Sequence, residues 1–357
     1  FNWAVLKTTC DIESNESRIL QLIKDLDSGH ITILNECLPF DGGSSWSMVG
    51  GRKLSRLWRY TLHYHGWLVE LAYGCKGDNR FECEKLIVKY LGDWIITCKI
   101  GGRGFNHYPW NSYTISTRLD YWRQLIAILP SKFWQDNLAL KMSFEESFKM
   151  QTQYLSDHLE WDLRGNHLLR DALGLINGSS LIEGSIKTRF EKKAISMTLD
   201  QIEEQILGDG SHFELSPMYH IQFMFDLIKI FQLSAETELR KKIICSLQKM
   251  WKYINWLKHL DGKLVQFNDG SLMDLELAQE QMQMMGIQTY DNETKGVKFF
   301  KNSGVLVWQS NCCVFFMDAG KIGPDYQPGH AHADTLSLEL SIYGRRLFVD
   351  PGTYSYT

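Results

Sequence analysis

The chain has 357 residues, of which 44% are hydrophobic and 22% charged, so it is long enough for a full-sized core and for more than one domain. Its formal net charge of −4 argues against a nucleic-acid-binding protein, because phosphate contacts need an excess of basic residues. No apolar run approaches the roughly 20 residues that a membrane-spanning helix needs. Aromatic residues make up 13% of the chain, with 12 tryptophans. This favours sugar binding, since the apolar faces of sugar rings stack on aromatic side chains.

Up to about residue 290, apolar residues recur at intervals of three and four, which is the period of an amphipathic helix. The pattern predicts helices over residues 17–26, 54–73, 82–96, 116–129, 144–163, 186–207, 218–231, 235–257 and 272–285. About ten helices in tandem, joined by short turns, favour antiparallel pairs that curl into a solenoid or an (α/α) toroid over a four-helix bundle.

After Asn292 the pattern changes to short runs of β-branched and aromatic residues. These runs predict strands over residues 297–300, 305–309, 312–317, 335–342 and 346–349. Gly344 with Arg345 indicates a tight hairpin. We therefore expect a helical domain over residues 1–292 and the start of an antiparallel β-sandwich over residues 293–357. Because the last predicted strand leaves an open sheet edge, we also expect further strands beyond Thr357 in the intact protein.

The eight cysteines are scattered, without a CxxC motif or regular spacing. This pattern is typical of unpaired thiols and leans towards the cytoplasm. The chain opens at Phe1 instead of an initiator Met, so a removed signal peptide is an open alternative. The compartment is therefore left undecided.

Two polar segments interrupt the helical pattern. In the first, Asn166 and His167 follow Gly165, and the alternatives are a helix N-cap with a surface histidine or a functional pair. In the second, Ser216 and Pro217 suit the N-cap and first position of a helix, which places Tyr219 in its first turn. There the phenol can face a cleft, or it can be a core tyrosine with a satisfied hydroxyl.

The third segment carries His330 and His332 at the start of a predicted strand. Alternate residues of a strand lie on one face, so both imidazoles suit a metal site or one ligand beside one base. Asp350 follows on the next strand and could add a ligand. Two histidines and one aspartate suit zinc, but a closed structural site needs four ligands, and solvated strand histidines are the bland alternative.

Six motifs in this order give the chain a resemblance to the heparinase II/III-like polysaccharide lyases, and most closely to the branch found with bacterial surface-polysaccharide genes. The motifs lie at residues 57–64 (LWRYTLHY), 110–118 (WNSYTISTR), 163–169 (LRGNHLL), 209–220 (DGSHFELSPMYH), 267–269 (FND), and 329–337 with 349–354 (GHAHADTLS, VDPGTY). Thr61 and Ser211 depart from the family pattern at positions without an expected chemical role.

The resemblance implies an (α/α) toroid followed by an antiparallel β-sandwich, with the active cleft between them. By position, Asn166 matches the residue that binds the uronate carboxylate, with His167 beside it, and Tyr219 and His330 match the catalytic tyrosine and histidine. His332 and Asp350 match two ligands of a structural zinc ion, whose third ligand would lie beyond Thr357. No organic cofactor is implied.

Further residues in or beside the motifs are candidates for contact with an acidic polysaccharide: Arg59, His63, Tyr64, Trp110, Tyr113, Arg118, His212 and Glu214. Arginines such as Arg59 and Arg118 can pair with carboxylates or sulfates, and a structural salt bridge is the alternative. Aromatic rings such as Trp110 can form sugar-stacking walls or belong to the core of the helical domain. The oligomeric state is not predicted.

The resemblance implies β-elimination at a 4-linked uronate, in which the C5 proton leaves and the bond to O4 breaks. Tyr219, with an ordinary pKa near 10, suits an acid as it stands, and His330 suits a base at neutral pH. The uronate configuration decides which of them takes the proton. A uronyl C5-epimerase needs the same groups, and a glycan-binding or assembly protein without turnover is the non-enzymatic alternative. A family-typical location is the bacterial periplasm or cell surface.

Overall fold

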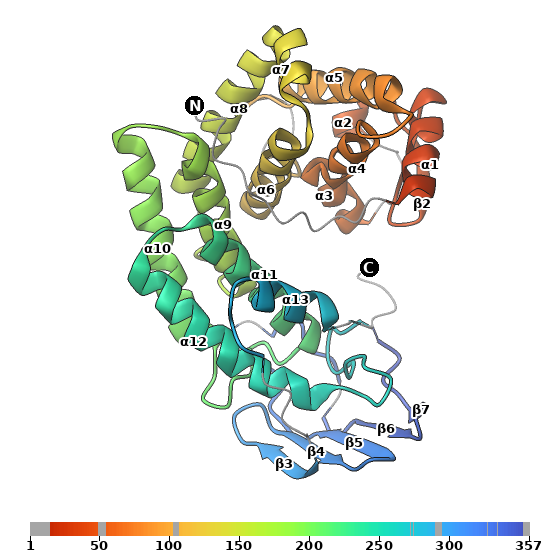
Figure 1. The fold of residues 1–357 in the computed structure, drawn as a ribbon, viewed down its shortest axis with the longest axis vertical. Coiled ribbons are helices and arrows are strands. Elements are labelled where there is room, and N and C mark those ends of the chain that lie inside the picture. The colour runs from red at the N-terminus through yellow and green to blue at the C-terminus, as the bar shows by residue number, and fades with distance from the viewer. Residues whose placement is uncertain are drawn as a thin grey trace. The chain divides into compact units, whose positions relative to one another are not determined.

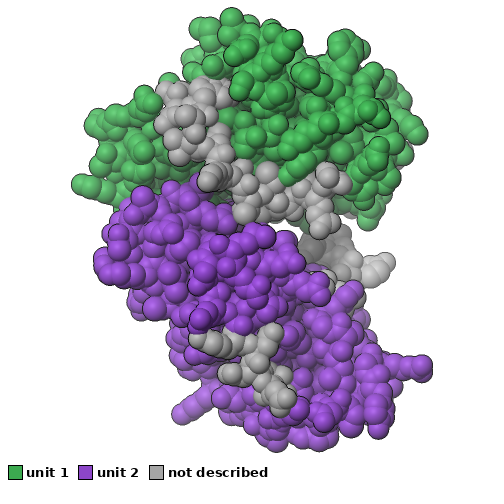
Figure 2. All heavy atoms as spheres, viewed as in Figure 1, with its two compact units in different colours: residues 1–160, 173–194 green, residues 161–172, 195–357 purple. Residues whose placement is uncertain are grey.

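A computed structural model of the chain describes residues 15–48, 55–102, 107–271, 273, 275–289, 295–326, 328–333 and 335–352. Its contacts divide the chain into two compact units, shown in Figure 2: unit 1 comprises residues 1–160 and 173–194, and unit 2 comprises residues 161–172 and 195–357. The helices predicted over residues 54–73 and 272–285 each begin at a residue outside the described ranges. The motif residue Asp334 also lies outside them.

Unit 1 is built mainly from helices (Figure 1). In chain order they are α1 (Glu16–Asp27), α2 (Ser45–Met48), α3 (Arg56–Tyr64), α4 (Gly66–Gly74), α5 (Arg80–Thr97), α6 (Ser112–Ile128), α7 (Ser131–Asp136) and α8 (Leu138–Asp157). A β-hairpin, β1 (His30–Ile33) and β2 (Glu36–Pro39), follows α1. Side-chain oxygens of Asn15, Ser55 and Asn111 accept backbone N–H groups at the starts of α1, α3 and α6, which fixes where these helices begin. No helix in the described ranges is both long and apolar enough to cross a membrane.

The single helix predicted over residues 54–73 is two helices, because His65 breaks it. His65 has a positive φ of 70°, so the chain turns between α3 and α4. A hydrogen bond of the buried imidazole offsets the cost of this backbone conformation: Nδ1 of His65 accepts the indole N–H of Trp122 at 2.8 Å. The periodicity alone did not reveal this turn, since apolar residues continue on both sides of it.

Helix α9 (Asn166–Leu181) runs from unit 2 into unit 1 and was not predicted. Its sequence contains Gly174 and Gly178, which disfavour an isolated helix. Within unit 1 these glycines allow close packing: a Cβ at Gly174 would overlap Ser116, and one at Gly178 would overlap Thr152. Tertiary packing therefore forms a helix where local propensity argues against one.

Unit 2 combines the start of α9 and the end of α10 (Ser185–Gln205) with α11 (Pro217–Leu233), α12 (Thr237–Ile254), the 3₁₀ turn η1 (Asn255–Leu257) and α13 (Glu276–Met284). Helix α11 packs on α12 and α13. As predicted, Ser216 is the N-cap of α11 and Pro217 its first residue.

The strands of unit 2 form one antiparallel sheet in the order β3 (Gly296–Phe300), β4 (Val305–Gln309), β5 (Cys313–Asp318), β6 (Leu338–Ile342) and β7 (Arg345–Phe348) (Figure 1). This confirms the predicted change from helices to antiparallel strands. The last turn uses Tyr343 and Gly344, both with positive φ, one residue earlier than predicted. Strand β6 begins at Leu338 instead of residue 335, since the chain is still irregular there.

Alternate residues divide the sheet into two apolar faces. One face is buried and includes Phe300, Val307 and Phe316. On the other face Trp308 pairs laterally with Val297 and Phe315, and its side chain is 45% exposed. An antiparallel sheet with one buried face agrees with the β-sandwich predicted from the sequence.

A buried polar network fixes β6 to the segment that follows η1. Glu339 is fully buried and pairs with His259 Nε2 at 2.8 Å, while its second oxygen accepts the backbone N–H of Gln266 at 2.6 Å. Ser341 on the same strand contacts His259 Nδ1. Because an unpaired buried carboxylate would be costly, these contacts fix the position of the chain just before Phe267-Asn268-Asp269.

The buried histidines of unit 1 predict acid sensitivity. Burial, reinforced by the nearby charge of Arg118, lowers the pKa of His63 to about 3. The unfolded chain takes up this proton below about pH 6.5, so stability is lost as the pH falls from there towards the folded pKa, by about 2 kcal/mol between pH 6.5 and 5 for this one residue.

His63→Asn keeps an acceptor for the indole N–H of Trp94 but cannot titrate. Urea unfolding at neutral pH and near pH 5 should therefore show a smaller loss of unfolding free energy for the variant than for the wild type. Equal losses in the two proteins would contradict a neutral, buried His63.

Candidate active site

The first site segment is the turn into α9. Arg164 and Gly165 both have φ near 57°, which directs the chain so that Asn166 and His167 occupy the first turn of the helix. Gly165 is needed here for a second reason, because a Cβ would overlap the carboxylate of Glu214. Among the described residues, no hydrogen bond ties the Asn166 side-chain amide to another group.

Glu214, from the segment that leads into α11, lies against the first residue of α9 and is only 4% exposed. Its Oε1 accepts the backbone N–H of Asn166 at 3.2 Å, and its Oε2 lies 3.3 Å from Nε2 of His330. Burial raises the pKa of Glu214, and the charge of His330, the Asn166 N–H and the charge of His167 oppose that rise. The carboxylate thus links the Asn166 turn to His330.

The second segment leads into α11. Leu215 has a positive φ of 60°, and Ser216 then begins the helix, with Tyr219 in its first turn. The hydroxyl of Ser216 also donates to the backbone oxygen of Asp269 at 2.7 Å. Asp209, at the start of this segment, accepts the Ser211 hydroxyl and the backbone N–H groups of Asn302 and Ser303. Burial raises the pKa of Asp209, but these hydrogen bonds, that of Ser211 first, hold it below the usual value.

The third segment is the turn at Asn268 and Asp269. Asn268 has a positive φ of 57°; its Nδ2 donates to the backbone oxygen of Leu215 at 3.1 Å and its Oδ1 accepts the N–H of His332 at 3.2 Å. Asp269 contacts His330 twice: its backbone N–H donates to the His330 oxygen at 3.0 Å, and its Oδ2 lies 3.1 Å from His330 Nδ1. This turn therefore joins α11 to the loop that carries His330.

Tyr219 and His330 meet as stacked rings, with centroids 3.5 Å apart and planes inclined by 27°. The His330 side chain is 20% exposed, so it is open to a ligand on one side while its ring nitrogens face Glu214 and Asp269. The structure thus brings Asn166, His167, Tyr219 and His330 to one place in unit 2, although they come from residues up to 164 apart in the chain (330 − 166).

The loop between β5 and β6 is tied at its outer part by Tyr326. The Tyr326 hydroxyl donates to Glu204 Oε1 at 2.8 Å, and the Arg164 guanidinium lies over its ring at 5.2 Å. Burial and the Glu204 contact raise the pKa of Tyr326, so it stays a neutral phenol. The loop is fixed to α10 before it reaches His330.

Sequence comparison matches the chain to two family profiles: Heparinase II/III N-terminus over residues 36–295, and Heparinase II/III-like, C-terminal over residues 292–357. The chain belongs to the heparinase II/III family. It is 24% identical to a heparin-sulfate lyase of Pedobacter heparinus, covering 84% of this chain and 48% of that protein. It is 22% identical to a heparin-sulfate lyase of Bacteroides thetaiotaomicron, covering 88% of this chain and 50% of the relative.

The fold is also that of solved members of this family. The crystal structure of heparinase III matches with a TM-score of 0.79 at 20% identity, over 97% of this chain and 60% of that one. Heparan sulfate lyase HepC from Pedobacter heparinus matches with a TM-score of 0.66 at 22% identity, over 99% of this chain and 58% of that one. The chain therefore spans about half the length of the curated relatives that it matches.

Three residues predicted to touch the glycan are buried in the structure, and the contacts that they make there are internal to the protein. Arg118 is fully buried and donates to Gln151 and to the backbone oxygens of His63 and Pro109, and burial lowers its pKa to about 9. His63 is buried beside it. His212 is buried in unit 2, where Nε2 contacts Gln205 at 2.8 Å and burial lowers its pKa. These motif positions hold the fold together.

The remaining predicted substrate contacts of unit 1 stay predictions. Trp110 is nearly buried, donates to the Cys98 oxygen at 2.7 Å, and lines a hollow of about 370 Å³ within unit 1. Arg59 lies over the ring of Tyr108 at 5.4 Å. The half-buried rings of Tyr64 and Tyr113 are 6.2 Å apart.

The predicted zinc ligands receive no support from the described residues. The backbone N–H of His332 donates to Asn268, and Asp350 Oδ1 accepts the N–H of Gly352 at 2.8 Å. Within the described ranges no three His, Cys, Asp or Glu side chains lie close enough together to hold a metal ion. Zinc binding stays a prediction, and no chemical step is assigned to a metal.

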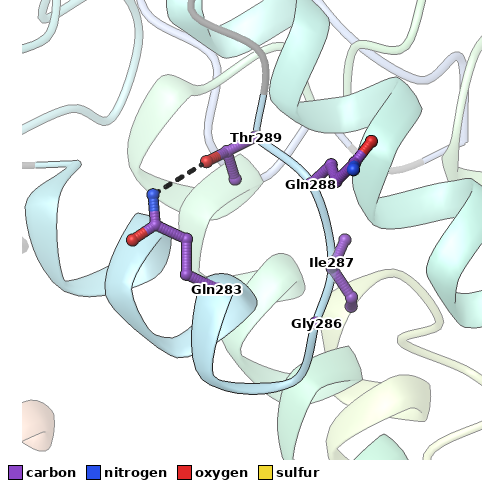
Figure 3. Close-up of a pocket in the computed structure, with 5 residues that line it drawn as sticks. All are labelled: Gln283, Gly286, Ile287, Gln288 and Thr289. Atoms are coloured by element: carbon purple, nitrogen blue, oxygen red, sulfur yellow. Dashed lines mark hydrogen bonds between the residues drawn. The ribbon is translucent and has the colours of Figure 1, made fainter.

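A second hollow, of about 370 Å³, lies at the end of α13 and contains no acid or base. Figure 3 shows its lining, in which Gln283 Nε2 donates to Thr289 Oγ1 at 3.2 Å. The other lining residues are Gly286, Ile287 and Gln288. Without a titratable group this hollow is no candidate for proton transfer.

Sequence reasoning missed the role of Asp269. The motif Phe267-Asn268-Asp269 was noted, but no function was assigned to its carboxylate. A conspicuous Asn-Asp turn was the available signal, since such turns often hold positive-φ residues. Nothing local in the sequence indicates that this turn meets His330, which is 61 residues away (330 − 269).

The Glu214 contact at Gly165 leads to a stability prediction. Gly165→Ala should cost about 1 kcal/mol for the positive φ and about 1 kcal/mol more for displacing Glu214 from the Asn166 N–H. Gly262→Ala is the matched control: it also has a positive φ, but a Cβ there meets nothing within 4 Å. Urea unfolding should show the larger loss for Gly165→Ala, and equal losses would contradict the overlap with Glu214.

Proposed function

We propose that this protein is a polysaccharide lyase that cleaves a uronate-containing acidic glycan by β-elimination. Support comes from membership in the heparinase II/III family and from relatives named heparin-sulfate lyases. The observation that carries the proposal is the stack of Tyr219 on His330 beside the first turn of α9. Heparan-sulfate-type glycosaminoglycans are the first substrates to test.

The difficult step is the removal of a carbon-bound proton at C5 of the uronate. Charge then develops on the uronate carboxylate, so donors aimed at that group lower the barrier. In our proposal the Asn166 amide donates to the carboxylate, with His167 beside it. Both side chains stand at the N-terminus of α9, where the helix dipole also favours negative charge. Each well-placed donor can contribute about 3 to 4 kcal/mol.

The elimination needs a base for the C5 proton and an acid for the leaving oxygen. The base removes the proton, the electron pair forms the C4=C5 double bond, the C4–O4 bond breaks, and the acid protonates O4. Tyr219 and His330 are adjacent, so one sugar ring can reach both groups. A neutral phenol can donate as it stands, and imidazole can accept a proton near neutral pH. The configuration at C5 decides how the two roles are shared.

The proposal predicts a new absorbance from the unsaturated uronate when the protein is incubated with heparan sulfate, heparosan, hyaluronan, alginate or bacterial capsule. Tyr219→Phe should lower the initial rate by about 100-fold or more, because proton transfer by a positioned group contributes that much. Tyr343→Phe is the matched control, since Tyr343 lies 81% exposed in the β6–β7 turn, and it should keep the wild-type rate.

A flat absorbance trace on every polymer, from a folded protein, would contradict the lyase proposal. Solvent deuterium appearing at C5 in that experiment would indicate a uronyl C5-epimerase, which uses the same groups but breaks no glycosidic bond. Glycan binding without either reaction would indicate a binding protein.

A further inference from the structure

We propose that Glu214 and Asp269 are positioning residues that clamp the His330 imidazole, with one carboxylate at each ring nitrogen. This deepens the proposed function, on which it rests, because it states how the histidine of that site is held. Oε2 of Glu214 lies 3.3 Å from Nε2, and Oδ2 of Asp269 lies 3.1 Å from Nδ1. Neither carboxylate belongs to the four residues that the proposed mechanism uses, Asn166, His167, Tyr219 and His330.

On the Nδ1 side, Asp269 is attached to His330 at two points. The side-chain contact is matched by the backbone bond from the Asp269 N–H to the His330 oxygen. Asp269 is itself fixed, since its backbone oxygen accepts the Ser216 hydroxyl at the start of α11. The carboxylate is therefore held against the helix that carries Tyr219 and is nearly buried, at 3% exposure.

On the Nε2 side, Glu214 serves two partners at once. One oxygen accepts the Asn166 N–H at the start of α9, and the other faces His330. Gly165 leaves the space that this carboxylate occupies. A side chain that is 4% exposed, with one oxygen bonded to the Asn166 N–H and the other facing His330, is poorly placed to bind a glycan, so a positioning role fits it better than a substrate contact.

The clamp explains how a histidine on a loop keeps one orientation. The stack on Tyr219 fixes the plane of the ring, but a 180° flip about the Cβ–Cγ bond would put the ring carbons Cδ2 and Cε1 where Nδ1 and Nε2 now face the carboxylates. A proton on Nδ1 donated to Asp269 makes one orientation and one tautomer the favoured one, as the aspartate does in a Ser-His-Asp triad. Nε2 then carries the lone pair that can take up a proton, and the adjacent Glu214 carboxylate stabilises the charge of the ring once that proton is bound.

Two near-isosteric variants test the clamp. Asp269→Asn can turn its amide donor towards Nδ1 and so favours the other tautomer, while Glu214→Gln still offers an oxygen to the Asn166 N–H but loses the charge at Nε2. We expect kcat to fall about tenfold or more in each variant, with KM changed by less than about twofold, because the clamp acts on the histidine and not on substrate binding.

The tautomer is read directly from nitrogen NMR of protein labelled with [¹⁵N]histidine, in which His330 is assigned by the loss of its signals in His330→Gln. At a pH at which the ring is neutral, the wild type should show the proton on Nδ1, and Asp269→Asn should shift it towards Nε2. Asp226→Asn is the matched control, since this buried carboxylate of unit 2 pairs with Arg170 at 2.9 Å. It should lower stability without changing kcat or the His330 spectrum.

Wild-type kcat in both variants, or an unchanged His330 spectrum in Asp269→Asn, would overturn the clamp. The spectrum needs no substrate. If the wild type shows no lyase activity on any glycan, the proposed function fails, and the tautomer measurement still decides whether Asp269 orients His330.

Discussion

The buried carboxylate of Glu214 is the group on which the candidate site depends. A carboxylate taken out of water costs several kcal/mol unless charged or polar partners compensate. Here the partners come from the start of α9 and from the loop that carries His330. Because these partners are present only when both segments are in place, assembly of the site and burial of this charge are the same event.

Three segments reach the site through residues with a left-handed backbone. Gly165 precedes Asn166, Leu215 precedes the N-cap of α11, and Asn268 precedes Asp269. For Leu215 and Asn268 this conformation costs of order 1 kcal/mol or more, so surrounding contacts must hold it. The Asn268 side chain supplies two of them, to Leu215 and to His332. Of the five non-glycine residues described in unit 2 with a positive φ, three (Arg164, Leu215 and Asn268) therefore lie in the segments that carry the side chains of the site.

Much of this arrangement could be predicted from the sequence, for physical reasons. The helical and strand periods are readable in the sequence because each helix buries one stripe of residues and each strand buries one face. The ordered motifs identified the family. Burial within a motif was not readable: Arg118 looks like a glycan contact, yet its guanidinium satisfies carbonyl groups in the core of unit 1. Helix α9 was missed because its glycines lower helix propensity, and only packing against Thr152 and Ser116 explains them.

The contacts of the β5–β6 loop have a consequence for conformational entropy. The loop is attached to α10 through Tyr326, to Asp269 through His330, and to Asn268 through His332. These three attachments restrict the conformations that the backbone between them can adopt. Closing several short loops costs the chain its freedom during folding, when burial elsewhere offsets the loss. The His330 ring is therefore already ordered before a ligand binds. Binding of the ligand does not have to include the entropic cost of ordering the loop.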